Sequence, residues 1–155
     1  MDEKRRNEDG RSKEPERIRS YRDLKAWQLA RELVKHVYDV TKKFPREELY
    51  GLTQQLRRAA VSVPSNIAEG SGRGGLRDYI RFLQTGRGSL REVETQIFLA
   101  QDLGYITDAV TASFLRASEE CSKVLQGLIS SLERKMEQAS NVPSSAGASR
   151  PSPRT

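Results

Sequence analysis

Residues 110–136 read VTASFLRASEECSKVLQGLISSLERKM, and the spacing of their apolar side chains decides the fold class. Apolar residues recur every three or four positions, which is the spacing of one helix face and not the alternation of a β-strand. The apolar positions are Val110, Phe114, Ala117, Cys121, Val124, Leu125, Leu128, Ile129, Leu132 and Met136. The stretch therefore predicts a long amphipathic helix that begins at Thr107 or Asp108.

The same helical spacing occurs in three earlier segments of the chain. The first segment ends before Pro45, because proline disfavours the helical conformation in the residue that precedes it. The second opens after Pro45, carries an apolar stripe from Leu49 onward and stops at Gly70. It contains Pro64, whose ring removes a backbone donor, so we expect a bend there. The third covers about residues 76–101. Four amphipathic helices joined by short turns predict an all-α fold, an antiparallel up-and-down four-helix bundle with helix two kinked at Pro64.

The two ends of the chain differ in composition from this middle part. Residues 1–20 are a dense mix of charged residues, and residues 139–155 are rich in Ser and Pro. Neither composition can bury an apolar core, so we expect two disordered tails. The bundle domain is then expected over residues 21–138, a length that suits one core.

Side chains that carry chemistry are few. His36 is the only histidine and Cys121 the only cysteine. A metal site with paired histidines and a disulfide within the chain are therefore excluded. Cys121 lies within an apolar stripe, where a thiol behaves as a small hydrophobe. We expect no enzyme activity, no metal and no cofactor. With no apolar run of roughly 18 residues to span a bilayer, we expect a cytoplasmic protein without membrane contact.

The charge of the chain points to anionic partners. The net charge is +6 at pH 7, which favours nucleic acid or an acidic protein surface. Residues 57–91 contain seven arginines, no lysine and only two acidic residues, Glu69 and Asp78. Arginine presents a planar fork of donors that matches phosphate oxygens. The candidate nucleic-acid-binding residues are Arg57, Arg58, Arg73, Arg77, Arg81, Arg87 and Arg91. At 100° per residue, the last five fall within an arc of about 120°.

Two other interpretations of these arginines remain open. They form a solvated helix face with pairing inside the chain, or they contact acidic residues of another subunit or protein. The turn at residues 70–75 also satisfies G-x-G-x-x-G literally, but a helix and not a strand precedes it. A helix stop with a flexible turn is therefore favoured over a phosphate site built from free amides beside Arg73.

Trp27 and Tyr38 stand eleven residues apart and so share one line along the first predicted helix. Core packing is one interpretation of this pair. The other is an aromatic seam between subunits, because such residues are enriched at protein interfaces. Both residues are therefore candidates for an oligomer interface.

Five blocks of sequence carry a family resemblance. They are YRDL (21–24), YGLTQQLRRA (50–59), SVPSNIAEG (62–70), YIRFL (79–83) and SLREVETQ (89–96). In this order and at these distances they resemble the bacterial four helix bundle protein family. Its members include proteins encoded in intervening sequences of large-subunit ribosomal RNA genes. The match covers about residues 21–130.

The resemblance implies a four-helix bundle that assembles into a homopentameric ring. A related branch, the accessory variability determinant of diversity-generating retroelements, uses a basic surface to engage a reverse transcriptase and RNA. This chain is more similar to the intervening-sequence branch, and the resemblance supplies no catalytic residue. We therefore hypothesise a non-catalytic oligomer that binds nucleic acid, RNA in preference to DNA, through its arginines. The alternative is a protein-interaction scaffold or an accessory subunit, for example of a reverse transcriptase, with an acidic protein partner and incidental nucleic-acid affinity.

Overall fold

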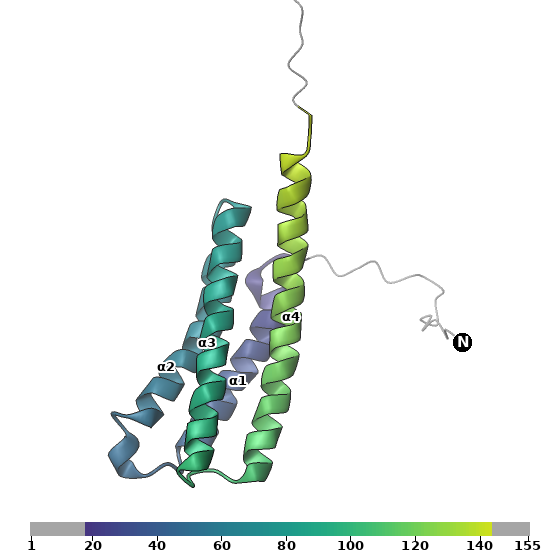
Figure 1. Cartoon of the computed structure of the whole chain (residues 1–155). Helices are drawn as coiled ribbons and strands as arrows, with labels where there is room; N and C mark the ends of the chain where they lie inside the picture. Colours follow the sequence, from purple (N-terminus) through teal and green to yellow (C-terminus); the bar gives the residue numbers. More distant parts are fainter. Residues whose placement is uncertain (1–17, 144–155) are drawn as a thin grey trace, which may run out of the picture.

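The computed structural model describes residues 18–143, which form an antiparallel up-and-down bundle of four α-helices (Figure 1). The helices are α1 (Lys25–Thr41), α2 (Leu52–Ser71), α3 (Leu76–Asp102) and α4 (Asp108–Ser140). A short 3-10 helix, η1 (Tyr21–Asp23), precedes α1, and a second, η2 (Arg46–Glu48), lies between α1 and α2. No strand occurs in this part of the chain, so the predicted all-α bundle is confirmed.

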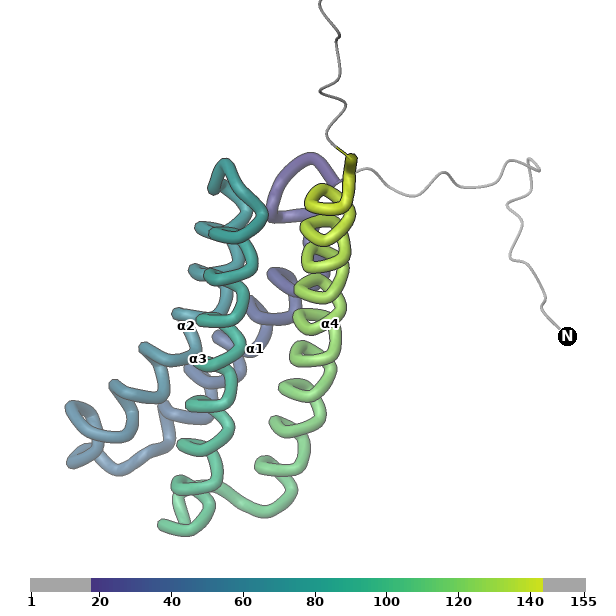
Figure 2. The backbone as a smooth tube through the Cα atoms, turned by 45° about the horizontal axis from the view of Figure 1, so that its top comes forward, coloured from purple at the N-terminus to yellow at the C-terminus, as the bar shows by residue number. Residues whose placement is uncertain are grey.

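Each helix packs against the helix that follows it, and α4 closes the bundle against α1. Within residues 18–143, the diagonal pairs α1 with α3 and α2 with α4 make no close backbone approach. Figure 2 shows α2 and α3 side by side, with α4 next to α3. The start of η1 and the end of α4 lie at one end of the bundle, and η2 lies at the other (Figure 1).

All four helices contribute to one apolar core. Val37, Leu56, Leu83 and Phe114 come from α1 to α4 in turn, and each is fully buried. Burial of this kind is the main stabilising contribution to a small domain. Cys121 is buried to the same degree, which confirms its predicted place in the core.

The predicted start of the second helix was wrong. α2 begins at Leu52, and the residues after Pro45 form η2 instead. Leu49, which was expected in the apolar stripe of the helix, is 47% exposed. The reason lies in Glu48, whose carboxylate accepts the backbone N–H of Leu52 at 2.8 Å. This contact satisfies one of the free donors at a helix N-terminus and fixes the first turn at Leu52.

α2 continues through Pro64 and ends at Ser71, one residue beyond the predicted stop. Pro64 has no N–H, so the carbonyl of Ala60 cannot receive its usual bond within the helix. Two residues further on, the side-chain amide of Asn66 donates to the carbonyl of Ser62 at 2.8 Å. The bend at Pro64 stays a prediction.

Gly70 allows α2 and α3 to approach each other closely. A Cβ atom at this position would lie 2.7 Å from the Cβ of Phe82 and 3.0 Å from a ring carbon of Tyr79. Such distances are shorter than van der Waals contact, so a larger residue would push the helices apart. Gly70 thereby fixes the spacing of the two helices that carry six of the seven candidate arginines.

The predicted tails lie largely outside the described residues. α4 extends to Ser140, two residues past the expected limit of the domain at Gln138. Residues 1–17 and 144–155 are not among those described, so the disorder of the tails stays a prediction. Among the described residues, none of the helices combines the length and the apolar character needed to span a bilayer.

Candidate nucleic-acid interface

The seven predicted arginines lie on the outside of α2 and α3 and on the connection between these helices. We call this set the arginine face, and it consists of Arg57, Arg58, Arg73, Arg77, Arg81, Arg87 and Arg91. Five of them are exposed, and Arg57 and Arg87 are partly buried. The residues that they contact differ, and these contacts divide the seven arginines into four groups. The arginine face is therefore not one uniform stripe.

Arg73 and Arg81 converge on the ring of Phe82. Their guanidinium carbons lie 4.9 and 5.6 Å from its centroid, which is within the range of a cation–π interaction. Arg73 also pairs with Glu69 at 2.9 Å, and Arg81 pairs with Asp78 at 3.3 Å. The two acids within residues 57–91 therefore each neutralise one arginine.

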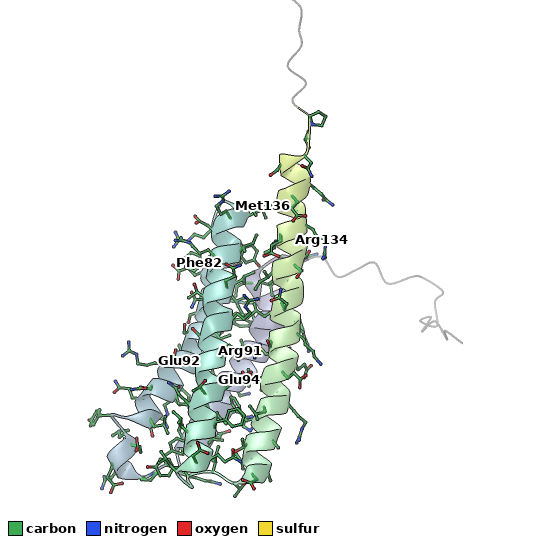
Figure 3. All side chains as sticks on the ribbon, in the orientation of Figure 1. Phe82, Arg91, Glu92, Glu94, Arg134 and Met136 are labelled. Atoms are coloured by element: carbon green, nitrogen blue, oxygen red, sulfur yellow. The ribbon has the colours of Figure 1, made fainter. Side chains whose placement is uncertain are left out.

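Arg87 and Arg91 lie at the seam between α3 and α4. Arg87 donates to the side-chain oxygen of Gln126 on α4. Arg91 pairs with Glu94 at 2.9 Å, and Glu94 in turn accepts a hydrogen bond from Ser118 of α4 at 2.6 Å (Figure 3). These contacts turn both arginines toward a neighbouring helix and leave only part of each side chain to solvent.

Within the arginine face, Arg58 and Arg77 are the two exposed arginines that make no ion pair with any described residue. Arg77 lies on the first turns of α3, in a shallow hollow shared with Met136 and Glu137 near the end of α4. A guanidinium that makes no ion pair with the described part of the bundle is available to an external anion.

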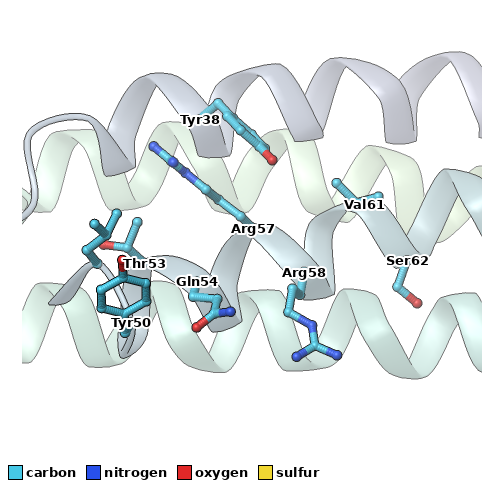
Figure 4. A pocket seen from close by; sticks show the side chains of 9 residues that line it. Tyr38, Tyr50, Thr53, Gln54, Arg57, Arg58, Val61 and Ser62 are labelled. Atoms are coloured by element: carbon cyan, nitrogen blue, oxygen red, sulfur yellow. The ribbon is translucent and has the colours of Figure 1, made fainter.

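Arg57 is held in place by two contacts to α1. Its Nε donates to the hydroxyl of Thr41 at 2.8 Å, and its guanidinium carbon lies 4.5 Å from the centroid of the Tyr38 ring. Figure 4 shows the side chain reaching from α2 toward Tyr38, while Arg58 extends to the opposite side of α2. Within residues 18–143, the terminal nitrogens of Arg57 have no hydrogen-bond partner.

A shallow depression of about 630 Å³ covers this part of α2 (Figure 4). We call it the α2 depression, and its lining includes Tyr38, Leu49, Tyr50, Gln54, Arg57 and Arg58. Tyr50 is 85% exposed and Val61, also at its wall, is 41% exposed. This site was not predicted from the sequence. Tyr50 lies in the connection between η2 and α2, where no helical spacing indicates whether a side chain is exposed.

Trp27 and Tyr38 occupy the same helix but have different surroundings. The Trp27 ring packs at 5.3 Å, edge to face, on Tyr21, and Arg31 lies 5.4 Å above it. It is partly buried, whereas Tyr38 is 40% exposed and is covered on one side by Arg57. Part of each aromatic ring therefore remains available on the outside of α1, and their role in an oligomer interface stays a prediction.

Two features of the described residues bear on metal binding and on nucleophilic chemistry. The described residues contain no cluster of three or more His, Cys, Asp or Glu side chains that could hold a metal ion. Burial in the core raises the pKa of the Cys121 thiol to about 12, with a smaller contribution from the charge of Glu120. A thiol with this pKa is protonated at neutral pH and is a poor nucleophile.

Comparisons with known proteins agree with this architecture. The family model described as 23S rRNA-intervening sequence protein matches residues 22–127, a range that contains every residue of the arginine face. A crystal structure at 1.70 Å of a protein with unknown function, from the S23 ribosomal protein family of Bacteroides thetaiotaomicron VPI-5482, has a similar fold. Its TM-score is 0.63 at 22% sequence identity, and the match covers 67% of this chain and 97% of that chain. No curated protein matches this chain significantly.

Proposed function

Because this chain belongs to the 23S rRNA-intervening sequence protein family, we propose that it is a non-catalytic, oligomeric protein that binds nucleic acid and prefers RNA. The arginine face is the proposed contact surface. Binding would be dominated by the phosphate backbone, so the affinity depends on charge and salt more than on base sequence.

The observation that carries this proposal is the excess of positive charge in one segment of the bundle. Residues 57–91 hold seven arginines against two acids, and the whole chain has a net charge of +6. This segment therefore accounts for nearly all of the excess of positive over negative charges in the chain. A surface of one sign attracts a polyanion and speeds its association.

The ion pairs within the arginine face are compatible with this role. The pairs of Arg73, Arg81 and Arg91 have arginine side chains that are 47%, 71% and 62% exposed. Exposed pairs contribute only about 0 to 1 kcal/mol to stability, so a phosphate can replace the carboxylate at small cost. Arg58 and Arg77 make no ion pair with a described residue, so a phosphate has no carboxylate to replace at these two positions.

Self-association is part of the proposal, with a pentamer as the expected assembly. The outer edge of α1 around Trp27 is the proposed contact between copies; Tyr38, the other candidate, is covered on one side by Arg57. A ring repeats the arginine face in every subunit, so weak individual contacts add through multivalency.

Binding to a structured RNA and to a duplex DNA of equal length, measured across a salt series, tests the proposal. The matched variants are a triple reversal on the face (Arg77→Glu, Arg81→Glu, Arg91→Glu) and a triple reversal elsewhere (Lys35→Glu, Lys123→Glu, Lys135→Glu). The three lysines are exposed positions of α1 and α4, so both variants change the net charge equally. Light scattering in the same buffers gives the mass of the oligomer.

We expect tighter binding to RNA than to DNA, and a steep loss of affinity between about 50 and 200 mM salt. The arginine variant is expected to lose affinity at least tenfold and to reduce the salt slope by about two to three per subunit. The lysine variant is expected to lose much less. Equal losses in the two variants would show that only net charge matters, and a monomer would remove the oligomer from the proposal.

A protein-binding scaffold is the second candidate, because three large apolar side chains are exposed near the end of α3. Phe98, Leu99 and Leu103 are 47%, 46% and 57% exposed. Exposed apolar side chains close together often mark a protein contact. An association with an acidic protein that survives nuclease treatment and is lost in Phe98→Ala would favour this role.

A further inference from the structure

We propose that the α2 depression binds an unpaired nucleotide of single-stranded RNA, with a base stacked on Tyr50, one phosphate bound by Arg57 and a neighbouring phosphate of the strand bound by Arg58. This inference rests on the proposed function, since it names the form of RNA that one part of the arginine face recognises. The remainder of the face would then follow the phosphates of the adjoining strand.

Arg57 is prepared for an anion before any ligand arrives. Thr41 accepts its Nε–H at 2.8 Å, and the Tyr38 ring supports the guanidinium plane at 4.5 Å. These two contacts fix the side chain but leave its terminal nitrogens without partners among the described residues. A fixed fork of donors loses little conformational freedom when it binds a phosphate. Thr41 and Tyr38 are positioning residues in this arrangement.

Tyr50 supplies a surface for stacking. Its side chain is 85% exposed, more than that of any other large apolar residue among those described, and it stands at the wall of the depression. Leu49 beside it is 47% exposed. Proteins that bind single strands combine such aromatic platforms with a basic groove, because every base offers a flat face whatever its identity.

The charge and size of the depression agree with a nucleotide. Its lining includes two guanidinium groups and no carboxylate, so it complements an anion and repels none. Its volume of about 630 Å³ falls within the range of small-ligand sites. The amide of Gln54 adds groups that can donate to or accept from a base edge.

Continuity with the arginine face favours RNA over an acidic peptide. Arg57 and Arg58 belong to both surfaces, so a strand that follows the face enters the depression without a change of charge. A base paired in a duplex cannot stack on Tyr50, because both of its faces are already covered by its neighbours. The site therefore distinguishes unpaired from paired RNA.

The test compares a labelled single-stranded oligouridine with a blunt-ended RNA duplex of the same length, using the full chain. Tyr50→Ala removes the ring, and Tyr50→Phe keeps it. Phe98→Ala is the matched control, because it removes an exposed aromatic ring that is not part of the lining of the depression. Arg58→Gln provides a second, independent variant at an exposed position.

We expect Tyr50→Ala to weaken binding of the single strand by about tenfold, since one base–aromatic stack is lost. Binding of the duplex should change less than twofold. Tyr50→Phe and Phe98→Ala should bind both RNAs like the wild type, and Arg58→Gln should weaken binding of the single strand. Circular dichroism would confirm that each variant is folded.

The outcomes separate this inference from the proposed function. If the wild type binds RNA and Tyr50→Ala binds the single strand equally well, the inference fails while the proposed function stands. If the wild type binds no RNA near physiological salt, both fail. If Tyr50→Ala changes the mass of the oligomer, or if an acidic peptide binds in place of RNA, the depression is a protein contact and the inference is wrong.

Discussion

Tyr105 and Glu48 join two connections that lie 57 positions apart in the chain. The phenol of Tyr105 donates to Oε1 of Glu48 at 3.0 Å, while Oε2 of the same carboxylate accepts the N–H of Leu52 at 2.8 Å. One side chain therefore both caps α2 and ties it to the connection between α3 and α4. The first turn of α2 carries part of the α2 depression, so this link holds the proposed site against the bundle.

The Tyr105 link predicts a specific dependence of stability on pH. Its hydrogen bond to Glu48, together with burial and the charges of Glu48 and Glu47, raises the pKa of Tyr105 above the ordinary value of 10.0. A raised folded-state pKa contributes stability below pH 10, and this stability is lost as the pH rises through the higher value. We expect Tyr105→Phe to melt at a lower temperature at about pH 8 and to lose less stability than the wild type toward about pH 11.

Thermal unfolding followed by circular dichroism across this pH range makes the comparison. Tyr50→Phe is the matched control, because it removes the hydroxyl of a tyrosine that is 85% exposed. Parallel curves for the wild type and Tyr105→Phe would contradict the prediction.

Substitution of Gly70 should destabilise the protein through the packing of α2 on α3. The added Cβ of Gly70→Ala would meet the Cβ of Phe82 at 2.7 Å. Overpacking of this kind costs about 1 to 3 kcal/mol. Gly74→Ala is the control, since nothing lies within 4 Å of a Cβ at Gly74. Denaturant unfolding of the two variants gives the free energies, and an equal effect at both positions would argue against a close approach at Gly70.

Cys121 should resist thiol reagents as long as the protein is folded. It is fully buried, and desolvation raises the pKa of its thiol from 9.0 to about 12. The thiolate fraction at neutral pH is then about a thousandfold lower than in the unfolded chain. We expect no labelling by a thiol reagent under native conditions and full labelling in guanidinium. Rapid labelling of the native protein would indicate that α4 opens easily near Cys121.

Thr41 should contribute to stability through the two hydrogen bonds of one buried hydroxyl. This hydroxyl donates to the carbonyl of Val37 at 2.8 Å and accepts from Arg57 at 2.8 Å. Thr41→Val keeps the shape but removes the acceptor for a charged donor, which costs about 1 to 3 kcal/mol. A double-mutant cycle with Arg57→Gln measures the coupling, and additive effects of the two changes would show that the bond contributes nothing.

The helices could be predicted from the sequence because their apolar spacing reports directly on a buried face. The start of α2 could not, because Glu47 and Glu48 have the composition of a helix N-terminus. Glu48 does stabilise that N-terminus, but through its side chain from outside the helix, with Gly51 as the N-cap residue. Sequence composition alone does not distinguish an acid in the first turn from an acid that precedes it.

The positions of the arginines could be predicted, but their partners could not. Spacing along α3 placed Arg87 and Arg91 on an arc, whereas their contacts to Gln126 and Ser122 depend on how α4 packs. Likewise, the contact between Arg57 and Tyr38 joins α2 to α1. The apolar spacing within each helix does not specify how the two helices are placed relative to each other. Contacts between elements require the tertiary arrangement, and the α2 depression is made of such contacts.

The even number of antiparallel helices has a practical consequence for attachment of the molecule. The start of η1 and the end of α4 leave the bundle at one end, whereas η2 and the first turn of α2 lie at the other (Figure 1). A label, an affinity tag or a surface linker joined next to the start of η1 or the end of α4 would therefore be attached at the end of the bundle opposite to Tyr50. Immobilised protein should keep the α2 depression accessible in whichever orientation it is tethered, which makes surface-based binding assays suitable for it.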